Sequence, residues 1–455
     1  MREKESNTVK KIIILGAGPT GLGAAYQLQK LNYKNWNIYE KNNYVGGLSA
    51  SFRDKQGFTW DIVGHILFSN NDRFNRLVDN LLRDEVLTFK RESWIWLKDN
   101  FIKYPFQNNF HTHPDKEIVI ECILGLIDNL YKNGKCRNFE EWIYYFFGKG
   151  IAKYFMTPYN NKVWACPLDR MDYGWIAERV SVIDINRILQ NIVYSRDDSD
   201  WGPNNVFKYP LFGGIGGLFD KFLPYINRHL YLNKNAIKVS VEKKEIVFQD
   251  GEKVSYDLLI STIPLNELLN KIENKPEQIN KSAKEFVWNG GYMVGIGINK
   301  PCPSKKNWIY FPQDDSPFYR VTYLSNYSPN MTPRGNYFSF LAETSYSTFK
   351  SVSKETIVEE TIRGLINSKL LEEEDKAQIV STCLIDVQHS FPVPFLGRDE
   401  VLREVQSFLS GNNIYSRGRF GGWKYEVGNM DNSLIQGMEI VEKILLNREE
   451  TIYRV

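Results

Sequence analysis

The sequence IIILGAGPTG, from Ile12 to Gly21, decides the predicted fold of this chain. Its four apolar residues favour a buried strand, and Gly16, Gly18 and Gly21 then form a GxGxxG turn. Apolar and small residues follow, which predicts a helix whose small side chains face the sheet. A strand, a glycine turn and a helix in this order present backbone N–H groups to the pyrophosphate of a dinucleotide. We therefore expect an α/β fold with a Rossmann-like, dinucleotide-binding domain.

The residues after this unit favour FAD as the dinucleotide. A second predicted strand, residues 36–39, ends in Glu40, at the spacing of an acid that holds a ribose 2′-hydroxyl. The pair Gly46-Gly47 lets the backbone approach the pyrophosphate, and such a pair is commoner in FAD proteins than in NAD dehydrogenases. Leu48 and Ser49 complete this second turn. A glycine turn in an unrelated α/β fold is the alternative interpretation.

Composition and charge describe an ordinary globular protein. The chain has 455 residues, a formal net charge of +3, 42% hydrophobic and 24% charged residues, a balance that indicates neither nucleic acid nor an anionic membrane as a partner. Its five cysteines are scattered without a CxxC pair, which argues against a disulfide framework and against a bound metal. No apolar run approaches the length of a membrane span, and the charged start is unlike a signal peptide. We expect a cytoplasmic location.

Patterns along the rest of the chain predict further domains. Residues 114–192 have a helical pattern, and 237–263 return to strands, while alternation between 291 and 345 indicates an antiparallel sheet. The predicted apolar stripe of the helical part consists of Ile118, Ile120, Ile123, Leu124, Ile127 and Leu130. We predict a discontinuous FAD-binding domain (1–110, 205–288 and 395–455), an inserted helical domain (111–204) and an antiparallel sheet domain for the substrate (289–394).

A second glycine-rich stretch lies near the end of the chain. Residues 415–429 read YSRGRFGGWKYEVGN, in which glycine, arginine and aromatic residues alternate. The final helix is predicted from Asn432 to Leu446, opened by Asp431 and Ser433, with its positive end toward the cofactor. A dinucleotide fold whose last segment returns to the cofactor is typical of flavoproteins. A simple helix cap explains Asp431 equally well.

Further motifs occur in the order seen in UDP-galactopyranose mutases. They are YPFQNN (104–109), PYNNKVW (158–164), ERV (178–180), WIYFP (308–312), YR (319–320), SNYSP (325–329) and the stretch from Arg417 to Asn429. The chain resembles this family from about Lys11 to Leu446, and its eukaryotic-type branch more than the shorter bacterial type. The resemblance implies a FAD domain, a helical domain and a six-stranded antiparallel sheet, with the sugar nucleotide bound between them.

The reaction implied by this resemblance is the isomerisation of a UDP-sugar between its pyranose and furanose forms, from UDP-galactopyranose to UDP-galactofuranose. The flavin acts as FADH2, its N5 attacks the anomeric carbon as a nucleophile, and NAD(P)H is the reductant. No net redox change accompanies turnover. The UDP-sugar is the expected partner, and family members of this type can form homo-oligomers.

The resemblance also assigns residues to the two ligands. Arginine suits a departing diphosphate because it binds phosphate oxygens through two N–H groups, and aromatic side chains suit the uracil. Catalytic roles fall to His65, Arg179 and Arg320. The cofactor residues are those of the two glycine turns, Glu40, Gly64, His65, Val239, Arg419, Gly428, Asn429, Met430 and Ser433. The substrate residues are Tyr104, Phe106, Gln107, Asn160, Trp164, Arg179, Asp200, Asn204, Trp308, Tyr310, Arg320, Tyr327, Phe391 and Tyr425.

Two departures from the family pattern bear on the substrate. Phe391 stands where the family has a tyrosine, and Asp200 stands where the eukaryotic-type pattern has an asparagine. These changes are either tolerated drift or a sign of another sugar, since a mispaired buried polar group costs about 1–3 kcal/mol. A mutase of a different NDP-sugar is therefore one alternative. A flavin amine oxidase or desaturase, and a flavoprotein that binds a nucleotide sugar without catalysis, are the others.

Overall fold

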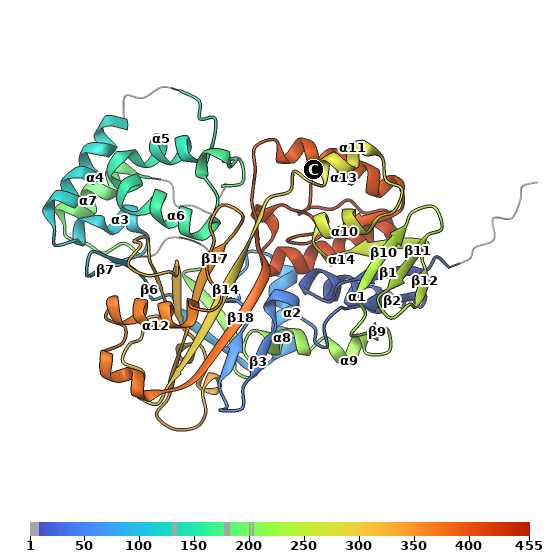
Figure 1. The fold of residues 1–455 in the computed structure, drawn as a ribbon, viewed down its shortest axis with the longest axis horizontal. Helices are drawn as coiled ribbons and strands as arrows, with labels where there is room; N and C mark the ends of the chain where they lie inside the picture. The colour runs from blue at the N-terminus through green and yellow to red at the C-terminus, as the bar shows by residue number, and fades with distance from the viewer. Residues whose placement is uncertain (1–8, 130–133, 177–182, 200–201, 203) are drawn as a thin grey trace, which may run out of the picture. The chain divides into compact units, whose positions relative to one another are not determined.

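The computed structural model describes residues 9–129, 134–176, 183–199, 202 and 204–455. The chain divides into two compact units, each discontinuous in sequence (Figure 1). Unit 1 comprises residues 1–50, 219–286 and 397–455, and unit 2 comprises residues 51–218 and 287–396. The boundaries of the functional domains given above stay a prediction.

Unit 1 is built on the parallel sheet that the first glycine turn predicted. In the described residues the strand order is β19-β13-β1-β2-β9, and every neighbouring pair is parallel. All residues of β1 and β13 are buried, which is typical of a parallel sheet covered on both faces. The strands are β1 (Ile12–Leu15), β2 (Trp36–Tyr39), β9 (Leu230–Tyr231), β13 (Leu258–Ser261) and β19 (Ile414–Ser416).

Helices and a small antiparallel sheet complete unit 1. The small sheet consists of β10 (Ala236–Ser240), β11 (Glu245–Phe248) and β12 (Lys253–Ser255). The helices and 3-10 turns are α1 (Pro19–Lys30), η1 (Gly47–Ser49), α9 (Leu223–Ile226), α10 (Leu265–Lys271), α11 (Glu277–Ser282), α13 (Arg398–Gly411), η9 (Tyr425–Val427) and α14 (Met430–Leu446). Helix α8 (Gly216–Asp220) spans the border of the two units.

Helices α1 and α14 pack at very short range. A Cβ placed on Gly23 would lie 2.1 Å from the carbonyl oxygen of Leu434, and one on Gly437 would lie 1.9 Å from the carbonyl oxygen of Thr20. These two glycines therefore let the helix backbones touch. The prediction that small residues of α1 face the sheet is wrong for Gly23, because this residue faces α14.

The N-terminus of α14 differs from the prediction. The helix begins at Met430 with Asn429 as its N-cap, so it starts earlier than the predicted Asn432. Asp431 and Ser433 consequently lie inside the first turn. Asn429 has an extended backbone conformation and no side-chain cap hydrogen bond, so the helix starts where the backbone turns helical after it.

Unit 2 contains a larger, mixed sheet. In the described residues its order is β18-β14-β17-β16-β15-β6-β7, so it has seven strands where six antiparallel ones were expected, and β15 pairs with β6 in parallel. Two of the seven strands are the hairpin β6–β7, which comes from early in the chain and covers the edge that β15 would otherwise expose. The strands are β6 (Ser93–Leu97), β7 (Asn100–Lys103), β14 (Trp288–Ile298), β15 (Trp308–Tyr310), β16 (Arg320–Tyr323), β17 (Phe338–Tyr346) and β18 (Ile379–Pro392).

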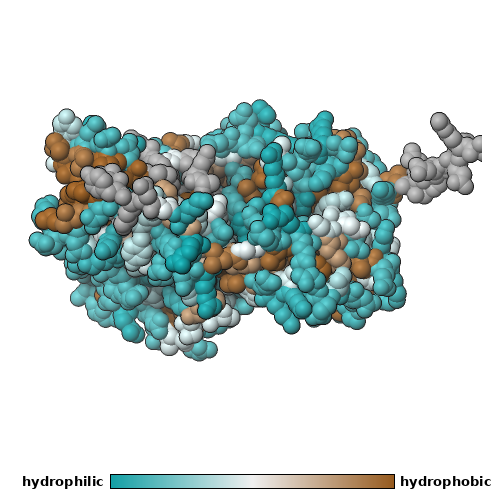
Figure 2. Space-filling model, turned by 90° about the horizontal axis from the view of Figure 1, so that it is seen from above, coloured by the Kyte–Doolittle hydropathy of each residue, from teal (hydrophilic) through white to brown (hydrophobic). Residues whose placement is uncertain are grey.

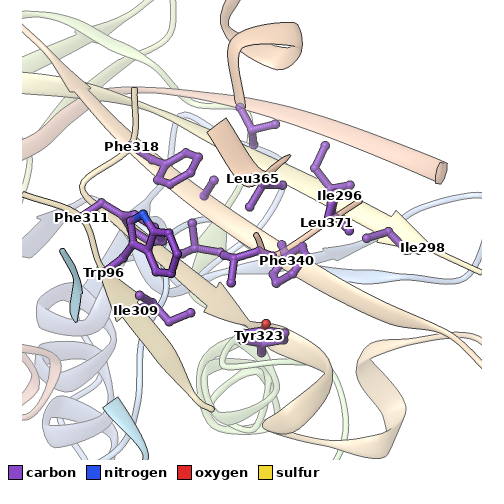
Figure 3. Packing of buried hydrophobic residues seen from close by; sticks show 14 of the residues in the cluster. Trp96, Ile296, Ile298, Ile309, Phe311, Phe318, Tyr323, Phe340, Leu365 and Leu371 are labelled. Atoms are coloured by element: carbon purple, nitrogen blue, oxygen red, sulfur yellow. The ribbon is translucent and has the colours of Figure 1, made fainter. Parts of the chain in front are cut away.

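The hydrophobic core of unit 2 lies between one face of this sheet and helix α12 (Ile357–Asn367) (Figure 3). Ile296 and Ile298 of β14, Phe340 of β17 and Leu365 of α12 are all buried in it. Residues two apart on a strand point to the same face of a sheet, and adjacent residues point to opposite faces. The residues that alternate with this core therefore point to the other face of the sheet, where the polar site residues lie.

The rest of unit 2 is largely helical. Its elements are β3 (Ser51–Arg53), β4 (Thr59–Asp61), α2 (Asp72–Leu82), β5 (Val86–Lys90), α3 (Phe106–Asn109), α4 (Lys116–Asn129), α5 (Phe139–Ile151), a π-helical turn η3 (Ala152–Met156), α6 (Thr157–Trp164), α7 (Ile185–Val193) and β8 (Val206–Pro210). None of the helices in the described part of the chain has both the length and the apolar character needed to cross a membrane.

The predicted apolar stripe of α4 is only partly buried. Ile118 is buried and Ile123 is half-buried, three members are exposed (Ile120, Leu124 and Ile127), and Leu130 lies outside the described residues. The buried face contains Gly125, whose Cβ would lie 2.9 Å from the Gly150 nitrogen of α5. Close helix packing at glycines thus leaves larger apolar residues on the surface, where hydrophobic side chains gather at the helical end of unit 2 (Figure 2).

Candidate cofactor and substrate sites

The two glycine turns of unit 1 meet and form a cradle. Gly16 has φ +94° and Gly46 has φ +98°, conformations that residues with a side chain rarely adopt. Gly46 donates its N–H to the Ala17 carbonyl oxygen at 2.8 Å, and a Cβ on Gly47 would lie 3.2 Å from the Gly18 Cα. Helix α1 follows with no acidic residue in its first turn. Its first N–H groups can therefore bind an anion.

Glu40 ties this cradle to the end of β2. Its buried carboxylate accepts the Ala17 N–H at 2.7 Å and the Asn42 N–H at 2.9 Å. Asn42 Nδ2 donates to the same carboxylate at 2.8 Å. An ionised carboxylate has about four lone-pair sites, so one site remains for a further donor such as a ribose hydroxyl. Gly21 lies in the first turn of α1, and Leu48 and Ser49 lie in η1. The structure thus brings the predicted residues of both glycine turns together.

The start of α14 adds polar groups in the same unit. Arg419 donates to the Gly428 carbonyl oxygen at 3.2 Å and lies 5.1 Å from the ring centroid of Tyr425. The hydroxyl of Ser433 is buried and has no hydrogen-bond partner among the described residues. Buried hydroxyls are normally paired. This unpaired hydroxyl and the positive end of α14 fit the polar edge of a flavin, and the glycine cradle fits its pyrophosphate.

A row of polar residues crosses the large sheet of unit 2. Tyr310 on β15 is opposite Arg320 on β16, and Arg320 is opposite Glu343 on β17. All three alternate with core residues, so they point away from the hydrophobic core. Arg320 donates to Glu343 from Nε at 2.5 Å and from Nη2 at 2.8 Å. Sequence analysis missed Glu343, although an acidic residue inside the apolar run 338–346 is a signal for it.

The Gly64-His65 turn is fixed to this ion pair. The Gly64 N–H donates to Glu343 Oε1 at 2.8 Å, and Arg320 Nη2 donates to the Gly64 carbonyl oxygen at 2.9 Å. A Cβ on Gly64 would lie 3.1 Å from Thr322 Oγ1, which explains why glycine suits this close approach. His65 follows directly and is half-buried. Gly64 and Arg320, which were predicted separately, therefore belong to one hydrogen-bonded cluster with Glu343.

Aromatic side chains surround Tyr310. The ring centroids of Tyr104 and Tyr159 lie 5.0 Å and 5.3 Å from that of Tyr310, and Phe155 connects Tyr159 to Phe106. Burial raises the pKa of Tyr159 and of Tyr310 above the ordinary value. Both phenols thus keep their protons at neutral pH and remain hydrogen-bond donors. Tyr159 was missed, although it lies inside the PYNNKVW motif.

Buried Asp198 holds α3, the helix that carries Phe106 and Gln107. Its carboxylate accepts from Asn108 Nδ2 at 3.2 Å and from Asn191 Nδ2 at 3.1 Å, and it forms a two-bond ion pair with Arg187. Its N–H donates to Asn109 Oδ1 at 2.7 Å. Sequence analysis missed Asp198, because only the fold brings α3, α7 and this loop together.

Arg91 connects two of the predicted substrate residues. Its Nη1 donates to Asn204 Oδ1 at 2.5 Å and its Nη2 to the Ser199 carbonyl oxygen at 2.7 Å. The same guanidinium lies 5.4 Å from the ring centroid of Tyr104. Asn204 and Tyr104 therefore share one buried arginine, which sequence analysis missed. A single arginine in a strand-like segment carries no sequence signal for such a role.

Helix α6 holds Asn160 and Trp164. The Trp164 Nε1 donates to Asn160 Oδ1 at 3.2 Å, and the Asn160 amide donates to the Met156 carbonyl oxygen at 2.7 Å. The Trp164 ring lies 5.8 Å from that of Phe391. Between them in sequence, Lys162 donates to the carbonyl oxygens of Gln313 and Ser316 at 2.7 Å and 2.8 Å. Burial lowers the pKa of Lys162 to about 7.

Tyr327 packs over a buried carboxyl group. Its ring lies 5.0 Å from that of Tyr209, whose hydroxyl donates to Asp61 Oδ2 at 2.6 Å. Asp61 also accepts from Ser51 Oγ at 2.6 Å and from the Ile215 N–H at 3.1 Å. Burial raises the pKa of Asp61 to about 6 and raises the pKa of Tyr327 as well. The Tyr327 hydroxyl therefore stays protonated at neutral pH.

The remaining predicted residues are dispersed. Trp308 lies on β15, with its ring 5.9 Å from that of Phe207. Val239 lies in β10, buried, and its carbonyl oxygen accepts the Glu273 N–H at 3.1 Å. Arg179 and Asp200 lie outside the described residues.

Two comparisons relate this chain to known proteins. Residues 14–81 match the family model described as an NAD(P)-binding Rossmann-like domain. A crystal structure of reduced UDP-galactopyranose mutase superimposes with a TM-score of 0.94 and 41% sequence identity, covering 97% of this chain and 95% of that chain.

More distant structures share the fold alone. A fatty acid isomerase from P. acnes that produces CLA has a TM-score of 0.65 and 14% identity, covering 96% of this chain and 99% of that chain. Putrescine oxidase bound to putrescine has a TM-score of 0.61 and 15% identity, with the same two coverages.

Proposed function

This chain belongs to the UDP-galactopyranose mutase family, and we propose that it interconverts UDP-galactopyranose and UDP-galactofuranose with reduced FAD. It is an isomerase and a flavin-dependent mutase by that membership. The identity of the sugar, the redox state of the flavin and the residue roles below are proposals.

The observation that carries the proposal is the way Arg320 is held. Its Nε and Nη2 are occupied by Glu343 and by the Gly64 carbonyl oxygen, whereas Nη1 has no hydrogen-bond partner among the described residues. A guanidinium fixed on one side presents the N–H groups of the other side to an anion at little entropic cost. Arg320 therefore suits the diphosphate of a UDP-sugar, whose negative charge grows as the bond to the sugar breaks.

Tyrosine hydroxyls support the same role. Tyr310 shares the face of Arg320 and Tyr327 is buried nearby in unit 2, and burial raises the pKa of both. Each phenol can therefore donate a hydrogen bond to a phosphate oxygen at neutral pH. Tyr104, Phe106 and Gln107 would bind the uracil, the aromatic rings by stacking and the amide through its donor and acceptor.

Unit 1 supplies the groups proposed to hold FAD. The cradle of Gly16, Gly18 and Gly47 would receive the pyrophosphate, Glu40 the ribose, and Arg419 with the first turn of α14 the flavin ring system. When bound and reduced, the flavin supplies a nucleophilic nitrogen for the anomeric carbon. We propose NAD(P)H as the reductant. Roles for His65, Arg179, Asp200 and Phe391 rest on the family resemblance.

The experiment that tests this function is anaerobic turnover. Purified protein with bound flavin is reduced with dithionite under nitrogen and incubated with UDP-galactofuranose, and the sugar nucleotides are separated by HPLC. Formation of UDP-galactopyranose by the reduced protein only is the expected result. If reduced protein converts none while UDP still perturbs the flavin spectrum, the substrate is a different NDP-sugar. Oxygen consumption with an amine substrate would instead support an oxidase.

A further inference from the structure

The loop of residues 417–424 in unit 1 carries Arg419 and three glycines (Gly418, Gly421 and Gly422), and no strand or helix is formed within it. Glycine loses the most conformational freedom on folding, so a glycine-rich loop needs outside contacts to keep one conformation. Residues 447–455, which follow α14, provide such contacts at Arg417, Gly422 and Lys424. We call residues 447–455 the clamp segment.

The first contact is a buried ion pair at the start of the loop. Arg417 donates to Glu450 of the clamp segment from Nε at 2.5 Å and from Nη2 at 2.7 Å. Both side chains are more than nine-tenths buried. Nη1 of the same guanidinium donates to the Ser416 carbonyl oxygen at 2.8 Å. Each of the three guanidinium nitrogens of Arg417 thus donates to a group within the protein, so this side chain anchors the start of the loop.

The second contact is at the end of the loop. Tyr453 of the clamp segment donates its hydroxyl to the Gly422 carbonyl oxygen at 2.9 Å. A Cβ on Gly422 would lie 2.6 Å from the Tyr453 ring, so the loop backbone lies directly against this aromatic ring. The ring centroid is also 4.5 Å from the Arg417 guanidinium. Tyr453 thus contacts both ends of the loop.

The clamp segment is itself fixed to α14. Glu439 of α14 accepts the N–H groups of Thr451 and Ile452 at 3.0 Å and 3.1 Å, and Lys443 donates to Glu450 at 2.9 Å. The first turn of the same helix carries Ser433. One helix therefore holds both the clamp segment and the polar groups assigned to the flavin.

We propose that the clamp segment fixes loop 417–424 in its FAD-binding conformation, with Arg417 as the positioning residue through which it acts. The proposal rests on the proposed function only in taking FAD as the bound dinucleotide. Removing a clamp contact should weaken FAD binding although no atom of the clamp segment needs to touch the cofactor.

Three variants test this in the full chain. Tyr453→Phe removes one hydrogen bond and keeps the ring, Glu450→Gln breaks the buried ion pair, and Arg454→Ala is the matched control, since Arg454 is exposed and uses only its backbone oxygen in the contact with Lys424. FAD is stripped from each protein, the dissociation constant is measured by flavin fluorescence, and visible circular dichroism reports the environment of the rebound flavin.

We expect the FAD dissociation constant to rise about fivefold in Tyr453→Phe and about tenfold or more in Glu450→Gln, with Arg454→Ala unchanged. The flavin circular dichroism should change in the first two variants only, a readout that loss of general stability would not move. Equal constants and spectra in folded Tyr453→Phe and parent would overturn the clamp, even if Glu450→Gln failed to fold.

The same preparations separate this proposal from the mutase function. A parent protein that binds FAD but does not convert UDP-galactofuranose would refute the proposed substrate. The FAD dissociation constants of the variants would still show whether the clamp segment acts on FAD binding. A parent protein that takes up no FAD would overturn both.

Discussion

The guanidinium of Arg320 and the carboxylate of Glu343 face each other across β16 and β17 and form two hydrogen bonds, at 2.5 Å and 2.8 Å. Glu343 is fully buried, and the Gly64 backbone bonds to both partners. A buried ion pair of this kind contributes little net stability, but breaking it is costly because one charge is left uncompensated. Its value here is the fixed direction it gives to the remaining N–H groups of Arg320.

Arg320→Lys tests that direction. Lysine keeps the positive charge but cannot form the two parallel bonds to Glu343 or reach Gly64 in the same geometry. We expect kcat/KM for UDP-galactofuranose to fall roughly tenfold or more, the equivalent of a charge-assisted hydrogen bond of about 1.5–3 kcal/mol. Arg334→Lys, an exposed arginine of the same unit, is the control. Equal kcat/KM in parent and Arg320→Lys would contradict the assignment.

Asp198→Asn should weaken nucleotide binding without touching the flavin. The change removes the charge that Arg187 pairs with and weakens the carboxylate contact with Asn108 of α3, while the backbone bond to Asn109 stays. We expect the dissociation constant for UDP to rise about fivefold, and the FAD dissociation constant to stay that of the parent. The neighbouring Asp197→Asn removes an ion pair of exposed Asp197 with Lys103, and a surface pair of this kind is worth little in water. Isothermal titration calorimetry measures UDP binding by both variants. Equal UDP dissociation constants for Asp198→Asn and Asp197→Asn would show that Asp198 does not position the site.

Gly437→Ala should destabilise unit 1. A Cβ at this position would lie 1.9 Å from the Thr20 carbonyl oxygen, so α1 and α14 must move apart, at a cost of about 1–3 kcal/mol for an overpacked contact. Gly411→Ala is the matched change, since nothing lies within 4 Å of its Cβ position. It should be neutral or stabilising by about 0.5–1 kcal/mol. Urea unfolding of the two variants gives the comparison, and equal midpoints would refute the close helix contact.

Asp61 should make stability depend on pH. Burial raises its pKa from 3.8 to about 6 in the folded protein, so the folded state holds a proton that the unfolded state has lost between these pH values. The contribution of Asp61 to the free energy of unfolding is therefore fully present below pH 3.8 and is lost as the pH rises through 6. The loss amounts to about 3 kcal/mol, at ~1.4 kcal/mol per pKa unit. In Asp61→Asn this loss between pH 4 and pH 7 should be absent. The free energy of unfolding is measured at pH 4 and at pH 7 for the parent and for Asp61→Asn, with Asp84→Asn as the exposed control. If Asp61→Asn keeps the pH dependence of the parent, Asp61 is not the source of that dependence.

The two glycine turns could be predicted from the sequence because their signals are local. The glycines of IIILGAGPTG and the pair Gly46-Gly47 take backbone conformations and close approaches that depend on neighbours in sequence. Glu40 follows its strand directly, and the structure places it against the same turn. The exact start of α14 was missed by two residues, the ordinary error when several polar residues compete to cap a helix.

For the substrate site, the sequence analysis named individual residues but not the residues that hydrogen-bond to them or pack against them. Tyr310 and Arg320 were named from motifs, but Glu343, Arg91, Asp198 and Tyr159 were missed or given no role. Their partners lie on other elements that the tertiary fold brings together, and their charges or rings have no periodic signal. The stripe on α4 failed for a related reason, because glycine contacts with α5 decide which face is buried.

The sequence by itself determined the dinucleotide fold, the glycine turns and the identity of the motif residues, because these depend on local backbone geometry and on residue type. Only the tertiary structure decided that Glu343 joins Arg320 to Gly64, that two glycines bring α1 against α14, and that residues 447–455 hold the loop after β19. Such contacts join segments that are distant in the chain, and their energy depends on burial, which a sequence pattern does not specify.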